Sequence, residues 1–156
     1  VLFQAPFQVW KSWQKGNYPY LEIDNYHKYF NGAKIRFGAY GDPAALPIHI
    51  LTSLKALCAN NTSYTHQWQE KASQGLKTLS MASVDNEHEA KKAVKMGWRY
   101  FRVAKPEDNL LKNEIICPNV THKVSCVDCG LCNGAKPNDT RKNIVIPVHG
   151  VRANRF

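Results

Sequence analysis

Short apolar or β-branched runs, each followed by a helical pattern, recur from residue 33 to the end of the chain. The strands that this rhythm predicts are 34–40, 62–68, 79–84, 98–104, 114–117 and 143–149. In the clearest helix between them, 47–58, Ile48, Leu51 and Leu54 recur at helical spacing. Alternation of strands and helices is typical of βα units that build a parallel sheet. The pattern therefore predicts an α/β fold.

Two further helices have recognisable ends. Asp85 is placed to be the N-cap of a helix over 86–96. Residues 5–15 have Pro6 where a first helical turn tolerates it and Gly16 just past the end. The broad apolar face of this first helix, which carries Trp10 and Trp13, predicts packing against a sheet.

The length of the chain decides between parallel architectures. A closed eightfold barrel takes about 200 residues or more, and this chain has 156. A doubly wound sheet is the other arrangement, but residues 38–41, Gly-Ala-Tyr-Gly, match neither a Rossmann turn nor a P-loop. We therefore expect a partial, open parallel β/α barrel of about six strands with a C-terminal cysteine-rich metal loop.

We expect one domain over 1–156, with an N-terminal helical or irregular segment at 1–32 and a metal-binding loop at 117–142. Residues 1–4, Val-Leu-Phe-Gln, resemble the end of a strand already under way, so the natural chain is expected to extend upstream. No apolar run reaches the length of a membrane span, and no secretory signal opens the sequence. These features favour a cytoplasmic globular protein without a membrane partner.

The cysteines carry the sharpest chemical pattern. Cys126, Cys129 and Cys132 follow one another at two-residue gaps, and Cys117 ends a predicted strand upstream. Three close thiolates with a remote fourth match the way iron–sulfur cubanes are held, whereas structural zinc more often draws pairs of cysteines from two loops. Both metals stay open, and a disulfide or free thiols are the plainer alternative. Cys58, on the buried face of its helix, is expected to be a small core residue.

A second group of polar side chains falls at predicted strand ends or within strands, where α/β folds place their sites. Asp42 and Asp85 also have a simpler role, since each is well placed as a cap. Arg36 and Arg102 would point into one cavity and hold a small anionic ligand with their guanidinium groups. The full set of expected ligand-binding residues is Arg36, Tyr40, Asp42, Tyr64, His66, Asp85, Arg102 and His149.

The charge balance bears on partners. Lys and Arg number 21 against 12 Asp and Glu, which gives a formal net charge of +9. Such an excess favours polyanionic partners such as nucleic acid. The alternative is a solvated surface with a few cations inside a ligand cleft, because the basic residues are dispersed. They cluster only at Lys91, Lys92 and Lys95 and at the tail residues Arg152 and Arg155.

Several segments together resemble a family of phage and bacterial proteins that has no assigned activity. The matching segments are 4–6 with 9–10, 36–43, 64–68, 81–85, 97–103, 117–118, the three-cysteine loop and 149–150. Members resemble a shortened radical S-adenosylmethionine barrel, which implies the same partial barrel, a second cysteine-rich loop and a bacterial host cell. This chain contains no Cys-x3-Cys-x2-Cys motif. S-adenosylmethionine would therefore be a cofactor only if cysteines exist upstream of Val1.

Two functions follow as hypotheses. The first is a radical-enzyme-like partial barrel whose four cysteines hold an iron–sulfur cluster and whose strand-end cavity binds a small anion. The second is a non-catalytic nucleic-acid-binding protein in which the same cysteines hold structural zinc. Neither hypothesis assigns a catalytic residue.

Overall fold

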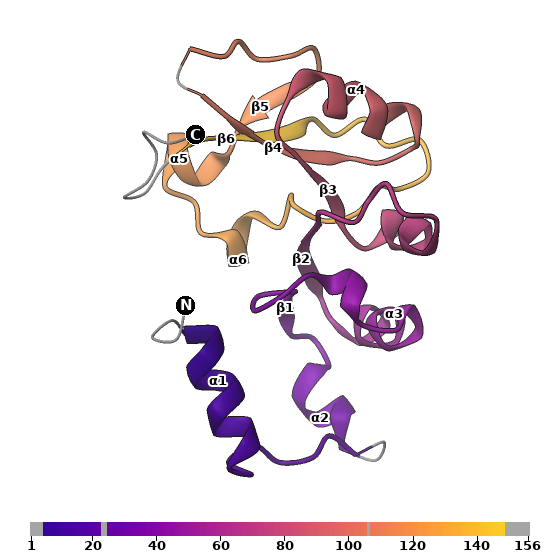
Figure 1. Ribbon diagram of the computed structural model, residues 1–156, viewed down its shortest axis with the longest axis vertical. Coiled ribbons are helices and arrows are strands. Elements are labelled where there is room, and N and C mark those ends of the chain that lie inside the picture. Colours follow the sequence, from indigo (N-terminus) through magenta and orange to yellow (C-terminus); the bar gives the residue numbers. More distant parts are fainter. Residues whose placement is uncertain (1–4, 23–24, 106, 149–156) are drawn as a thin grey trace.

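A six-stranded sheet forms the centre of the molecule (Figure 1). The computed structural model describes residues 5–22, 25–105 and 107–148. Its strands are β1 (Lys34–Phe37), β2 (Asn60–Thr65), β3 (Met81–Val84), β4 (Tyr100–Ala104), β5 (Glu114–Ile116) and β6 (Asn143–Pro147). Every pairing between neighbouring strands is parallel. The predicted open parallel α/β sheet is confirmed.

The strand order is β1-β2-β3-β4-β6-β5. The first four strands follow the chain, as they would in a barrel. The last two exchange places, because β6 pairs with β4 and leaves β5 at the edge. The end of β5 and the segment that follows it therefore lie at the border of the sheet.

Helices connect the first four strands. They are α3 (Ile48–Leu57), the 3-10 helix η2 (Lys71–Thr78) and α4 (Glu87–Lys95), with a short 3-10 turn η1 (Pro43–Ala45) before α3. The N-cap of α4 is Asn86, whose side chain accepts a hydrogen bond from the Glu89 amide. Asp85 is therefore not the N-cap. It lies one residue too early in the chain for its side chain to accept a hydrogen bond from the amide of Glu89, the third residue of α4.

The register places side chains on two distinct faces. Phe37, Ala82 and Tyr100 lie on the face that α3, η2 and α4 cover, together with the main apolar core. On the opposite face Met81 and Ile144 pack with Cys117 and Cys132 in a second, smaller core. The cysteine segment therefore covers the face that the crossover helices leave open, and Figure 1 shows α5 (Pro118–His122) and α6 (Cys126–Cys129) on the side of the sheet away from α3.

The first helix, α1 (Ala5–Gln14), does not pack as the sequence predicts. None of its residues is buried, and Trp10 and Trp13 are 49% and 61% exposed. In Figure 1 it lies apart from the sheet, and a second short helix, α2 (Tyr26–Phe30), follows it. The apolar face has the expected periodicity, but Trp10 and Trp13 on it remain exposed and the predicted packing against the sheet does not occur.

Across the described residues, no helix combines the length and apolar character that crossing a membrane requires.

Candidate metal centre

The segment from Cys117 to Asn133 is built from two short helices joined by tight turns. Cys117 directly precedes α5, and Ser125 caps α6 by accepting a hydrogen bond from the Asp128 amide. Gly130 ends α6 in the left-handed conformation, with a φ of 59°. Glycine suits this position because other residues adopt positive φ at a cost. The turn returns the chain toward the sheet directly before Cys132.

Hydrogen bonds fasten this segment to the sheet. The Ser63 amide of β2 donates to the Cys132 carbonyl oxygen over 2.9 Å. Arg99, just before β4, donates to the carbonyl oxygens of Leu131 and Asn133 over 2.8 and 3.0 Å. One bond comes from β2 and two come from the residue before β4, so the backbone around Cys132 is held in place whether or not the thiols bind a metal.

The four cysteines that the sequence singles out line one small cavity. Its volume is about 20 Å³, and Thr62 and Tyr64 of β2 form its wall on the sheet side. Cys117 and Cys132 are buried, Cys129 is partly buried and Cys126 is exposed. As they stand, no three His, Cys, Asp or Glu side chains in the described part of the chain are grouped closely enough to share a metal ion. Joint ligation therefore requires the side chains to turn further into the cavity.

The electrostatics of Cys132 reflect this gathering of thiols. Burial raises its pKa to about 11, and the nearby Cys117, Cys129 and Cys126 raise it as well. A hydrogen bond with Tyr64 acts in the opposite direction. A metal ion would reverse the situation, because a coordinating thiol is deprotonated by the ion's charge.

Arg36 and Tyr64, two of the predicted ligand-binding residues, lie on the cysteine face. The guanidinium carbon of Arg36 is 5.8 Å from the centre of the Tyr64 ring, a distance typical of cation–π contacts. Lys34 and Arg36 also line a cleft of about 270 Å³ that Cys126 and Gly130 close on the other side. The structure thus joins part of the predicted ligand set to the cysteines.

Arg102 lies on the other face. Arg36 is in register with Thr62 of β2. The same face of the sheet continues through Tyr64, Met81, Ser83 and Phe101. Arg102 is in register with Val84, which lies on the opposite face. Side chains alternate between faces along a strand, so the two arginines point away from each other. Arg102 is only 3% exposed, and its guanidinium is occupied by Glu114 at 2.7 Å. The predicted convergence of Arg36 and Arg102 in one cavity is wrong.

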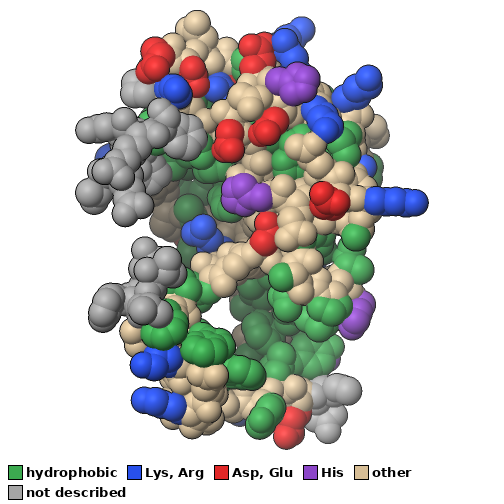
Figure 2. Space-filling view, in the orientation of Figure 1, with side chains coloured by type: hydrophobic (Ala, Val, Ile, Leu, Met, Phe, Trp, Pro, Cys, Tyr) green, Lys and Arg blue, Asp and Glu red, His purple; other side chains and the backbone are tan. Residues whose placement is uncertain are grey.

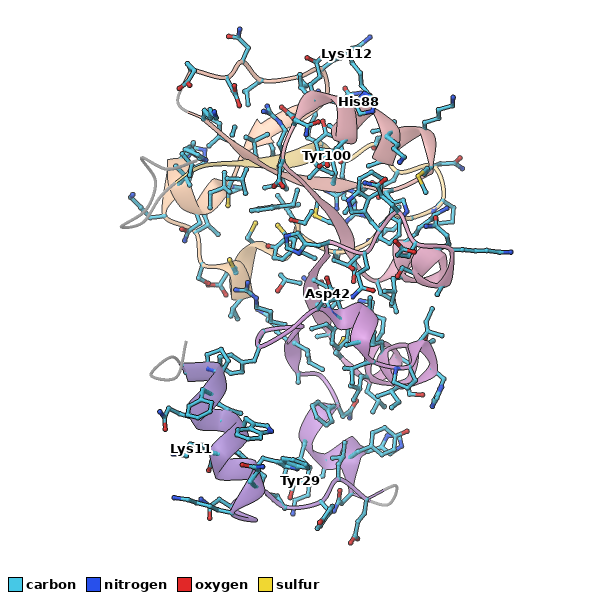
Figure 3. All side chains as sticks on the ribbon, viewed as in Figure 1. Lys11, Tyr29, Asp42, His88, Tyr100 and Lys112 are labelled. Carbon is cyan, nitrogen blue, oxygen red and sulfur yellow. The ribbon has the colours of Figure 1, made fainter. Side chains whose placement is uncertain are left out.

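Asp42 joins the ends of two strands and acts as a structural acceptor. It accepts hydrogen bonds from the Ala44 amide, the Thr65 hydroxyl and the His66 amide, at 2.9, 2.7 and 2.8 Å. Burial alone would raise its pKa, but these three hydrogen bonds outweigh it and the pKa is lowered. Figure 3 shows Asp42 at the turn beside β2. The simpler expectation for this residue, a cap, is the one the geometry supports.

The remaining predicted ligand residues do not assemble. Tyr40 is 59% exposed, the His66 side chain is 76% exposed, and Asp85 is exposed. His149 lies outside the described residues, as do Arg152 and Arg155. The side chains of Tyr40, His66 and Asp85 are therefore exposed to solvent and line no common cavity with Arg36 and Tyr64 among the cavities beside the cysteines.

Sequence reasoning missed the residues that hold the cysteine segment and β5 in place. Glu114 stands alone in an apolar strand, and it is the buried partner of Arg102. Arg99 is buried through contacts with a loop more than 30 positions away. Arg102 and Glu114 are charged residues that each lie in a predicted strand, and this could have indicated an ion pair between them. Nothing local indicates the carbonyl partners of Arg99.

Comparison with protein-family models, curated proteins and solved structures gives no match for this chain. What is established of the expected resemblance is the six-stranded parallel sheet itself.

Proposed function

We propose that Cys117, Cys126, Cys129 and Cys132 bind one metal ion, zinc, and that the protein is a metal-stabilised binding domain. The observation that carries this proposal is that all four cysteines line one cavity, although Cys117 precedes α5 and Cys126 begins α6. Four thiolates are a donor set that zinc and iron–sulfur clusters take, and hard cations do not.

The size of the cavity favours zinc over a cluster. About 20 Å³ is roughly the space that one water molecule needs, which suits a single ion. A cubane of iron and sulfide atoms would require the segment to move outward, away from the bonds that Arg99 and Ser63 make with it. The sequence spacing still favours a cluster, so the iron–sulfur site is the second candidate.

The ion would fasten the edge of the sheet. Cys117 directly follows β5, an edge strand, and the other three ligands belong to the segment hydrogen-bonded to β2 and to Arg99 before β4. Binding free energy at such a site adds to folding free energy, because the unfolded chain has no preformed site. Because Arg102 is paired with Glu114, the expected strand-end cavity loses one of the two arginines that were predicted to bind a ligand there. This favours a binding domain over a radical enzyme.

Metal analysis of protein purified without oxygen tests this proposal. We expect about one zinc per chain, zinc–sulfur distances of about 2.3 Å by X-ray absorption, and no visible charge-transfer band. Iron with acid-labile sulfide and a visible band would select the cluster, and no metal of either kind would reject the site.

The matched variants are Cys129→Ser and Cys58→Ser. Cys129 lines the cavity, whereas Cys58 is a buried thiol at the end of α3 that donates to the Lys55 carbonyl oxygen, a bond serine can keep. We expect Cys129→Ser to lose the metal and Cys58→Ser to retain it. Full metal content in the Cys129 variant would contradict the ligand assignment.

A further inference from the structure

A cavity lies away from the cysteines, beside α4. Its volume is about 780 Å³, within the range of small-molecule sites. The residues described between β4 and β5 form no helix, in contrast to the connections after β1, β2 and β3. The cavity adjoins this connection, because Leu111 and Lys112 line it together with Lys91 of α4. Figure 3 shows Lys112 and Tyr100 on the side of the molecule that α4 occupies.

Two guanidinium groups in its wall share one carboxylate. Arg141 binds Asp139 through its Nε at 2.8 Å and through a second, shorter contact. Arg99 Nε is 3.9 Å from the same carboxylate. Among the described residues, no other carboxylate lies within ion-pair distance of either arginine. The arrangement therefore keeps an excess positive charge.

Burial of this excess positive charge has a cost in free energy. The Arg99 side chain is only 5% exposed and that of Asp139 is 10% exposed. The terminal nitrogens of Arg99 donate to backbone carbonyl oxygens, but its Nε is buried and has no hydrogen-bond partner. Burial and the neighbouring Arg141 lower the pKa of Arg99, and hydrogen bonds from Arg141 hold the pKa of Asp139 well below its usual range. A buried cation without full compensation is stabilised by an anion nearby.

The mouth of the cavity adds further positive charge. Lys91, Lys112 and Lys136 line it and are exposed. Glu87 also lines it and pairs with Lys91 at 2.8 Å. Two carboxylates thus face five cationic side chains. Figure 2 shows Lys and Arg side chains projecting from the surface over α4.

We propose that this cavity binds a ligand with a phosphate group, which Lys112, Lys136, the buried Arg99 and the partly buried Arg141 attract, while apolar wall residues such as Val94 and Leu111 contact its body. A phosphate monoester carries close to two negative charges near pH 7. This charge is complementary to the excess positive charge of the cavity wall. The phosphate belongs either to a free mononucleotide or to the end of a nucleic acid strand. This inference is independent of the cysteine site.

Calorimetric titration of the full chain tests the proposal with four probes: inorganic phosphate, adenosine monophosphate, and one short oligonucleotide with either a 5′-phosphate or a 5′-hydroxyl. We expect adenosine monophosphate or the 5′-phosphorylated oligonucleotide to bind, and which of them binds identifies the source of the phosphate. Equal binding of the two oligonucleotides would overturn the proposal, because backbone contacts alone would then suffice. No binding of any probe would overturn it as well.

Charge reversal at matched positions locates the site. Lys112→Glu with Lys136→Glu should weaken binding by about tenfold or more. Lys28→Glu with Lys71→Glu changes the net charge equally at exposed positions of α2 and η2 that do not line the cavity, and should leave affinity within about twofold. Equal losses in the two double variants would overturn the proposal, since binding would then follow net charge alone.

Discussion

Arg102 reaches over β6 to form a doubly hydrogen-bonded ion pair with Glu114. Its Nε donates to Glu114 Oε1 over 2.9 Å, and its Nη2 donates to Oε2 over 2.7 Å. Both side chains are buried, at 3% and 0% exposure. Because β6 lies between β4 and β5, this pair ties the edge strand to the interior of the sheet.

Removing one partner of this pair leaves the other charge buried. We predict that Arg102→Met lowers the free energy of unfolding by about 3–5 kcal/mol, measured by urea denaturation. Lys91→Met is the matched control, because it breaks an exposed pair with Glu87, and it should cost about 0.5 kcal/mol or less. Similar losses in the two variants would show that the Arg102 pair contributes no more than a surface pair.

Asp42 should make stability depend on pH in the acid range. Its folded-state pKa is lowered, so its contribution is present above the unfolded value of about 3.9 and is lost as pH falls through the folded value. We predict that Asp42→Asn costs about 1–3 kcal/mol at pH 7 and that this difference from the parent protein shrinks below about pH 4. Denaturation at several pH values measures it. The exposed Glu107 provides the control variant Glu107→Gln, and a pH-independent cost at Asp42 would contradict the prediction.

The cysteines should differ in reactivity once metal is removed. Cys126 is exposed, whereas Cys132 is 7% exposed and packs with Met81 and Ile144. We predict that a thiol reagent labels Cys126 first and Cys132 only after local opening of the segment, as followed by mass spectrometry of peptides. Added zinc should protect both. Equal labelling rates in the metal-free chain would indicate that the segment does not pack on the sheet.

Gly134 allows the segment after Cys132 to approach the 3-10 helix η2. A Cβ at this position would overlap the backbone of Thr78 and Leu79, and the neighbouring Ala135 amide donates to the Lys77 carbonyl oxygen over 2.7 Å. We predict that Gly134→Ala costs about 1–3 kcal/mol of stability through overpacking. Gly32→Ala tests backbone conformation alone, since Gly32 has a positive φ and open space around it, and it should cost about 1 kcal/mol. A smaller loss at Gly134 than at Gly32 would argue against the close approach.

The sequence was sufficient for the order and type of the main elements. Apolar runs near residues 34, 81 and 144 all became strands of one parallel sheet, because period-two burial and strand–helix alternation are local properties. The cysteine spacing likewise predicted a shared location, since two-residue gaps and tight turns bring side chains together over a short distance. The helix over residues 5–14 also formed as its capping residues indicated.

Only the tertiary structure decided which face of the sheet each side chain meets. A shift of one residue in register moves a side chain to the opposite face, and this separates Arg36 from Arg102 although both lie in predicted strands. The exchange of β5 and β6 places β6 between the strands that carry Arg102 and Glu114, so their pair spans β6. Arg99 and Arg141 share Asp139 because the loop before β6 lies against Arg99, which is about 40 positions earlier in the chain. Long-range pairing of this kind leaves no periodic mark in the sequence, since its partners are fixed by chain topology rather than by neighbouring residues.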